Sequence, residues 1–68
     1  MQILIKGYST EQSVLILEII KYGNIIDQSI HSLYKFVITN RIYRYKGNVY
    51  LFVLINNRLV TFEELNEV

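Results

Sequence analysis

Val49-Tyr50-Leu51-Phe52-Val53-Leu54-Ile55 is an uncharged run in which every residue is apolar, and it decides the fold of this 68-residue chain. Successive side chains of a strand point to opposite faces, so a strand of this composition is apolar on both. A β-prone segment with a bare apolar face is an aggregation hazard. We therefore expect this strand to lie at the centre of a sheet whose two faces are both covered.

Turn residues on either side of this strand predict two hairpins. Gly47-Asn48 has glycine first, which suits a type II′ turn, and Asn56-Asn57 can adopt the positive φ angles of a type I′ turn. The result is a three-stranded antiparallel meander over residues 41–46, 49–55 and 58–62. These turns place Tyr43 opposite Phe52, and Leu51 opposite Phe62.

The predicted register gives the sheet two unlike faces. The aliphatic face comprises Ile42, Val49, Leu51, Val53, Ile55, Val60 and Phe62, and we expect it to receive a helix. The aromatic face comprises Arg41, Tyr43, Tyr45, Tyr50, Phe52, Leu54, Leu59 and Thr61. Three covers for the aromatic face stay open: the segment 25–38, a second copy of the chain, or a partner.

Upstream of the meander, a short strand at residues 2–5 and a helix up to Tyr22 are predicted. Ser9 and Gln12 have the spacing of a capping box, and Gly23-Asn24 suits a left-handed helix end. The apolar arc of this helix is about twice the roughly 100° that packing on one sheet requires. We therefore expect the helix to be contacted on more than one side.

Residues 24–40 are ambiguous. Ile26, Ile30, Leu33 and Val37 recur at helical spacing, which favours a short helix over residues 27–34 with Asp27 as its cap. An extended piece over residues 36–39 follows it, and strand remains the alternative for the whole segment. At the other end, the acidic residues 63–68 are expected to form a helical turn or a frayed tail.

The fold class expected is thus α+β, in a single domain over residues 1–68. A signal peptide and a membrane-spanning run are missing from the sequence, so we expect a soluble cytoplasmic protein. Eleven isoleucines and six asparagines, with no alanine or proline, indicate an AT-rich gene. Such a short chain is typical of a virus or mobile element, and its protein would then act in the host cytoplasm.

Catalysis is not expected. The chain has no cysteine and a single histidine, so it cannot form a zinc cage, and it has no glycine-rich phosphate loop. Asp27 and His31 would share one side of a helix, but two ligands do not make a metal site. We expect no enzymatic activity, no cofactor, no metal and no small-molecule substrate.

A binding protein is the leading functional hypothesis, since the chain is 51% hydrophobic and too small to bury so much apolar surface. We expect protein–protein interaction, as a homodimer or with another protein, through Arg41, Tyr43, Tyr45, Tyr50 and Phe52. The alternative is nucleic-acid binding by a basic sheet or a degenerate winged helix. Its cations would be Lys35, Arg41, Arg44, Lys46 and Arg58, although the net charge is only +1.

Overall fold

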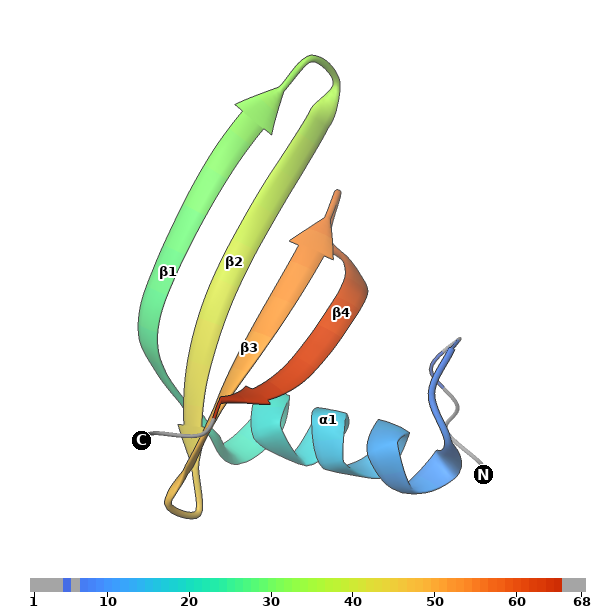
Figure 1. Cartoon of the computed structure of the whole chain (residues 1–68), viewed down its shortest axis with the longest axis vertical. Helices are drawn as coiled ribbons and strands as arrows, with labels where there is room; N and C mark the ends of the chain where they lie inside the picture. Colours follow the sequence, from blue (N-terminus) through green and yellow to red (C-terminus); the bar gives the residue numbers. More distant parts are fainter. Residues whose placement is uncertain (1–4, 6, 66–68) are drawn as a thin grey trace.

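The computed structural model describes residue 5 and residues 7–65, and it has one helix followed by a four-stranded antiparallel sheet (Figure 1). The elements are α1 (Thr10–Tyr22), β1 (Asn24–Leu33), β2 (Phe36–Tyr45), β3 (Asn48–Ile55) and β4 (Arg58–Leu65). Neighbours along the chain are neighbours in the sheet, in the order β1-β2-β3-β4. The predicted α+β class is confirmed, but the meander has four strands and not three. The predicted strand at residues 2–5 lies outside the described residues, apart from Ile5, which is in no strand.

Helix α1 begins as predicted. The Ser9 Oγ accepts a hydrogen bond from the Gln12 amide at 3.2 Å, and the Gln12 Oε1 accepts one from the Ser9 amide at 3.1 Å. The predicted left-handed end is wrong, since Gly23 is extended, with φ −72° and ψ 161°. The chain therefore leaves the helix directly into β1.

The helix predicted over residues 27–34 is wrong, because residues 27–33 belong to β1 and Tyr34 lies in the turn that follows it. Strand β1 pairs with β2 along its length, with one bulge at Ile26. A helix this short gains little without packing, whereas isoleucines suit a paired strand. Asp27 therefore caps no helix, and its Oδ1 accepts a hydrogen bond from the Gln28 amide beside the bulge. The extended piece predicted over residues 36–39 is confirmed as the start of β2.

The turn between β2 and β3 lies one residue earlier than predicted. Lys46 and Gly47 are its central residues, with φ angles of 49° and 79°, and Tyr45 pairs with Asn48. Tyr43 consequently faces Tyr50 and not Phe52. A shift of two positions in the pairing keeps every side chain on its expected face. The second turn is confirmed at Asn56 and Asn57, whose φ angles are 51° and 67°.

A bulge at Val60 changes the faces of β4. Leu54 pairs with Leu59, but Val53 pairs with Thr61, so Val60 is left as the extra residue. Phe62 therefore lies opposite Phe52 and joins the aromatic face. The strand then continues to Leu65, so the helical turn predicted after Phe62 is wrong for residues 63–65; residues 66–68 lie outside the described part of the chain.

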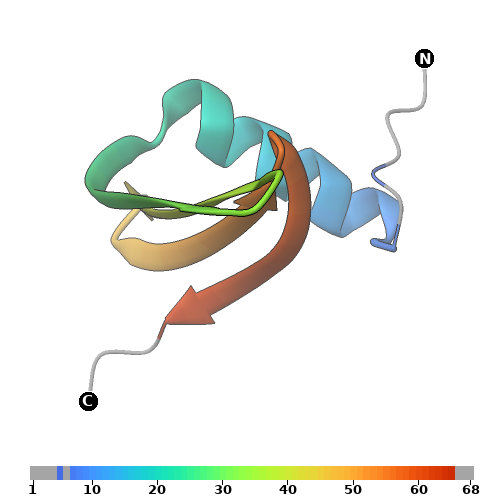
Figure 2. The same ribbon diagram turned by 90° about the horizontal axis from the view of Figure 1, so that it is seen from above.

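Helix α1 packs on the aromatic face of the sheet, which corrects the prediction that it would cover the aliphatic one (Figure 2). The buried core is formed by Ile16, Ile19, Tyr43, Tyr50 and Phe52. The Phe62 ring stacks on Tyr50 at 5.5 Å between centroids and meets Phe52 edge-on at 5.3 Å. Aromatic rings bury more apolar area than valine or leucine, so covering them removes more surface from water.

The opposite, aliphatic side of the sheet is not covered by any described element. We call it the open face: Ile38, Ile42, Val49, Leu51, Val53 and Ile55, each half-buried by its neighbours in the sheet. The segment 25–38 cannot cover it, because that segment lies within the sheet as β1 and the start of β2. The sequence left open whether the chain itself covers its second face, and the face without a described cover is the aliphatic one and not the aromatic one.

Candidate binding surface

The hairpin of β1 and β2 extends beyond the other two strands (Figure 1). Strand β3 pairs with β2 only as far as Ile38, so the end of the hairpin has no strand beside it. We call this end the tip: Leu33, Tyr34, Lys35, Phe36 and Val37. All five are exposed, and four of them carry large hydrophobic side chains. The tip is therefore an apolar projection from the body of the protein.

Tyr34 stands at the end of this projection. Its side chain is 95% exposed, and its φ angle is 56°. The left-handed region suits glycine or asparagine and is unusual for a bulky residue, at a cost of roughly 1–2 kcal/mol. An aromatic side chain at a strained, exposed turn contributes little to the fold. Such positions point to a functional constraint.

Hydrogen bonds fix the base of the tip to the sheet. The Asn56 Oδ1 accepts from the Val37 amide at 2.9 Å, and the Val37 carbonyl accepts from the Asn56 amide at 2.9 Å. Further along the hairpin, the Arg41 Nε on β2 donates to the Gln28 Oε1 on β1 at 2.7 Å. The first two bonds tie β2 to the residue that follows β3, and the third joins β1 to β2, so the tip is held by an ordered base.

The aromatic residues predicted to bind a partner lie mostly beneath α1. Tyr43, Tyr50 and Phe52 are 3%, 5% and 1% exposed, which places them in the core. Tyr45 is half-buried at the edge of α1, and its hydroxyl donates to the Glu18 Oε2 at 3.1 Å. Arg41 is half-buried, with the bond to Gln28 just described and a longer contact to the Tyr43 hydroxyl at 3.4 Å. A partner therefore reaches three of the five only if α1 moves away.

Sequence reasoning missed the tip because it placed Leu33 and Tyr34 on a helix. The signal that could have found it is Tyr34-Lys35, two residues that lie between Leu33 and the apolar pair Phe36-Val37. That pattern lacks the glycine or asparagine that normally marks a two-residue turn.

The five predicted nucleic-acid-binding cations are dispersed. Lys35 is at the tip, and Lys46 is in the β2–β3 turn at the other end of β2. Arg44 and Arg58 share the open face, but they lie opposite Val49 and Ile55, six residues apart on β3. At about 3.3 Å per residue this separation is about 20 Å. The sheet therefore brings no more than two of these cations onto one face.

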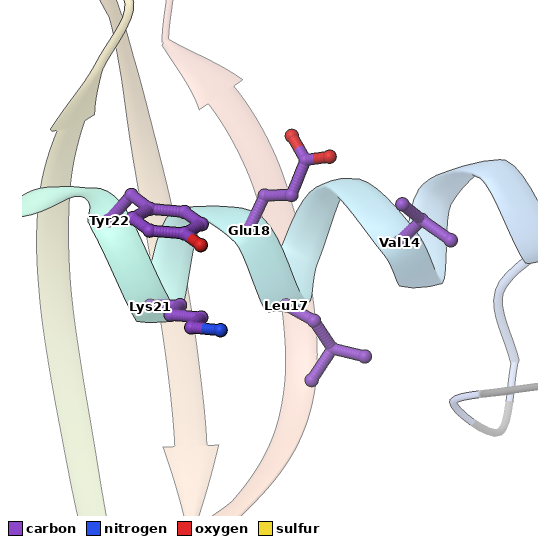
Figure 3. A pocket seen from close by; sticks show the side chains of 5 residues that line it. All are labelled: Val14, Leu17, Glu18, Lys21 and Tyr22. Atoms are coloured by element: carbon purple, nitrogen blue, oxygen red, sulfur yellow. The ribbon is translucent and has the colours of Figure 1, made fainter.

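The outer side of α1 carries a shallow hollow with a volume of about 240 Å³. It is lined by Val14, Leu17, Glu18, Lys21 and Tyr22, along the helix in front of the strands (Figure 3). Pockets for drug-sized ligands occupy about 300–1,000 Å³ and enclose their ligand, so this hollow fits a side chain better than a substrate.

Metal-binding clusters are not found in the described part of the chain, where no three histidine, aspartate or glutamate residues come together. Asp27 and His31 are on an extended strand, so about 13 Å separates their backbones and they cannot hold one ion. No second helix lies among the described residues to serve as the recognition helix of a winged-helix protein. None of the helical segments in residues 5 and 7–65 is long and apolar enough to cross a membrane.

Comparisons with protein-family models, with curated proteins and with solved structures find no match to this chain. The functional argument consequently rests on the surfaces described above.

Proposed function

We propose that this chain is a small non-enzymatic binding protein that acts through protein–protein interaction, with the tip of the β1–β2 hairpin as its docking surface. The observation that carries this proposal is Tyr34, an aromatic side chain that is 95% exposed at a turn where its backbone is strained. We further propose that it regulates its partner as a virus- or mobile-element-encoded modulator, and that it acts as a homodimer.

The chemistry of the tip supports a protein partner. Tyrosine and arginine are enriched among the few residues that dominate binding energy, and phenylalanine is common at interface centres. The tip offers Tyr34 and Phe36 together, 95% and 46% exposed, beside Leu33 at 56%. Because its base is fixed by the Val37–Asn56 hydrogen bonds, little order must be gained on binding.

Nucleic-acid binding has weaker support. Stacking of bases on Tyr34 or Phe36 would need phosphate-binding cations nearby, and Lys35 is the one predicted cation located at the tip. Arg44 and Lys46 lie toward the opposite end of β2. The aromatic rings and the basic side chains therefore do not form one continuous groove.

Replacing Tyr34 with glycine tests the proposal. Glycine relieves the left-handed strain but adds flexibility to the unfolded chain, so we expect stability to stay equal or to rise by up to about 1 kcal/mol. We expect partner binding to be lost in the same variant. When the photo-reactive residue benzoylphenylalanine replaces Phe36, we expect irradiation of the cells that produce the protein to cross-link it to its protein partner in an adduct. Adding Tyr34→Gly to the same chain should abolish that adduct.

Lys46→Gly is the matched control, because Lys46 has a similar φ angle of 49° in an exposed turn at the other end of the sheet. It should change stability in the same direction and leave the adduct intact. An adduct that survives Tyr34→Gly would contradict the proposal. Binding of an oligonucleotide in a gel-shift experiment would also contradict it, if the affinity fell steeply between about 50 and 200 mM salt, because such salt dependence is characteristic of phosphate binding.

A further inference from the structure

Strand β1 is an edge strand without the usual protection. All ten of its residues are exposed, and its outer side is paired with no described element. Natural edges are blunted by lysine, proline, inward charges or bulges. The stretch from Gln28 to Leu33 contains none of these, and the single bulge of β1 lies before it, at Ile26.

The other edge of the sheet is protected. Strand β4 carries Arg58, Glu63 and Glu64, all exposed, and the bulge at Val60 interrupts its ladder. Two copies of β4 paired about an axis at Glu63 or Glu64 would bring like charges together. Of the two edges, β1 has the longer uncharged stretch without a bulge, from Gln28 to Leu33.

The backbone groups available for pairing follow from the turn. Leu33 and Phe36 face each other across a two-residue turn, so they form a hydrogen-bonded pair. The alternation of an antiparallel ladder then turns Ser29 and His31 toward β2. The amides and carbonyls of Gln28, Ile30 and Ser32 point outward, away from the sheet. The outward Gln28 amide already donates to the Asp27 Oδ1 at 2.9 Å, so it must exchange this bond on pairing, whereas no such bond is found for Ile30 or Ser32 among the described residues.

We propose that β1 pairs antiparallel with β1 of a second copy, about a two-fold axis at Ser29, to give a continuous eight-stranded sheet. This inference rests on the proposed function and identifies the surface that makes the homodimer. In this register Gln28 and Ile30 of each copy form ladder hydrogen bonds with Ile30 and Gln28 of the other. The Asp27 carboxylate lies opposite the His31 imidazole of the second copy, twice by symmetry.

The side chains are self-complementary in this alignment. Asp27 and His31 share the open side of the sheet, as their partners Ile42 and Ile38 on β2 show. A two-fold axis through the sheet keeps them on one side, where an imidazole N–H can donate a hydrogen bond to a carboxylate across the strands. An axis at Ile30 would instead place the Asp27 carboxylate against Leu33. The Ser29 axis also places Leu33, 56% exposed, opposite the position of Ile25, 54% exposed, at each end.

Ile30→Pro tests the interface. Proline removes the outward amide of residue 30 and leaves the ladder to β2 intact, since edge strands accept proline on their free side. By size-exclusion chromatography with light scattering, we expect the wild type to have twice the 8.1 kDa chain mass and the variant to have the single mass. Ile30→Val keeps the amide and should remain dimeric. A monomeric wild type at high concentration, or a folded Ile30→Pro variant that stays dimeric, would overturn the proposal.

Substitutions of His31 test the register of the proposed β1–β1 pairing. His31→Lys should tighten the dimer several-fold because it places a fixed positive charge opposite Asp27, and His31→Asp should weaken it several-fold. Equal dimerisation constants for these two variants would refute the Ser29 axis.

Amide exchange covers the case in which Ile30→Pro fails to fold. In the wild type, the Ile30 amide should exchange slowly at high concentration and fast on dilution, whereas the Ser29 and His31 amides stay protected throughout. Fast exchange of the Ile30 amide at every concentration would overturn the proposal. The cross-linked adduct formed at position 36 reports separately on partner binding by the tip. Loss of the dimer and loss of partner binding are therefore distinguishable.

Discussion

Phe52→Ala is expected to leave the protein largely unfolded at room temperature. Phe52 is 1% exposed, lies beneath α1, and meets the rings of Tyr43 and Phe62 at 4.9 Å and 5.3 Å between centroids. Truncating a buried phenylalanine costs about 3–5 kcal/mol. A domain of this length has about 3–10 kcal/mol of stability in total, so the loss is comparable with the whole. Urea denaturation followed by circular dichroism measures the effect.

Val53→Ala is the matched control for this prediction. Val53 is the next residue on β3, but it lies on the open face and is half-buried. Removing two partly exposed methyl groups should cost about 1 kcal/mol. If Val53→Ala were as damaging as Phe52→Ala, α1 would have to cover the aliphatic face and the assignment of the core would be wrong.

The parts of the fold that depend on residues close together in the sequence were predicted correctly. Ser9 and Gln12 form the capping box, and Asn56-Asn57 form a turn with two positive φ angles. Central strand β3 was also predicted within one residue, because an uncharged run of this length between turn residues has few alternatives.

The choice of face for α1 could not be predicted, since both sides of β3 are apolar. Three facts decide it: the larger area of the aromatic rings, the Val60 bulge that adds Phe62 to them, and the Tyr45–Glu18 hydrogen bond. A bulge leaves no mark in the alternation of residues 58–65, and the hydrogen bond joins residues 27 positions apart. The aromatic residues that resembled an interface in the sequence are therefore the core.

The candidate site was missed for a related reason. Ile26, Ile30 and Leu33 have helical spacing, and only pairing with β2 over a long stretch makes this segment a strand. Tyr34 and Lys35 then form a turn that neither residue favours, with Tyr34 at positive φ. Local propensity fails at this point because the turn is imposed by the strands on either side. Such disagreement between local preference and structure is expected at functional positions.

Gly23→Ala is the second substitution expected to have a large effect, and here the cause is space and not backbone conformation. Gly23 is extended, with φ −72°, so any residue could adopt its backbone. A Cβ at this position, however, would lie 2.5 Å from the Ile19 carbonyl oxygen and 3.3 Å from the Tyr43 Cδ1. The same carbonyl accepts the Gly23 amide at 2.7 Å, so it cannot move without loss of the bond that ends the helix.

An alanine at position 23 must therefore push α1 away from β2 at the point where the helix passes into β1. Forced overpacking of this kind costs about 1–3 kcal/mol, measurable by urea denaturation. Asn24→Ala, one residue further along and exposed, is the control and should change stability by less than about 0.5 kcal/mol.

Because β1 follows directly after Gly23, the displacement of α1 should also reach the edge that we propose as the dimer interface. We therefore expect Gly23→Ala to weaken dimerisation as well as folding; if stability were equal to that of the wild type, the close approach of Gly23 to Ile19 would be disproved.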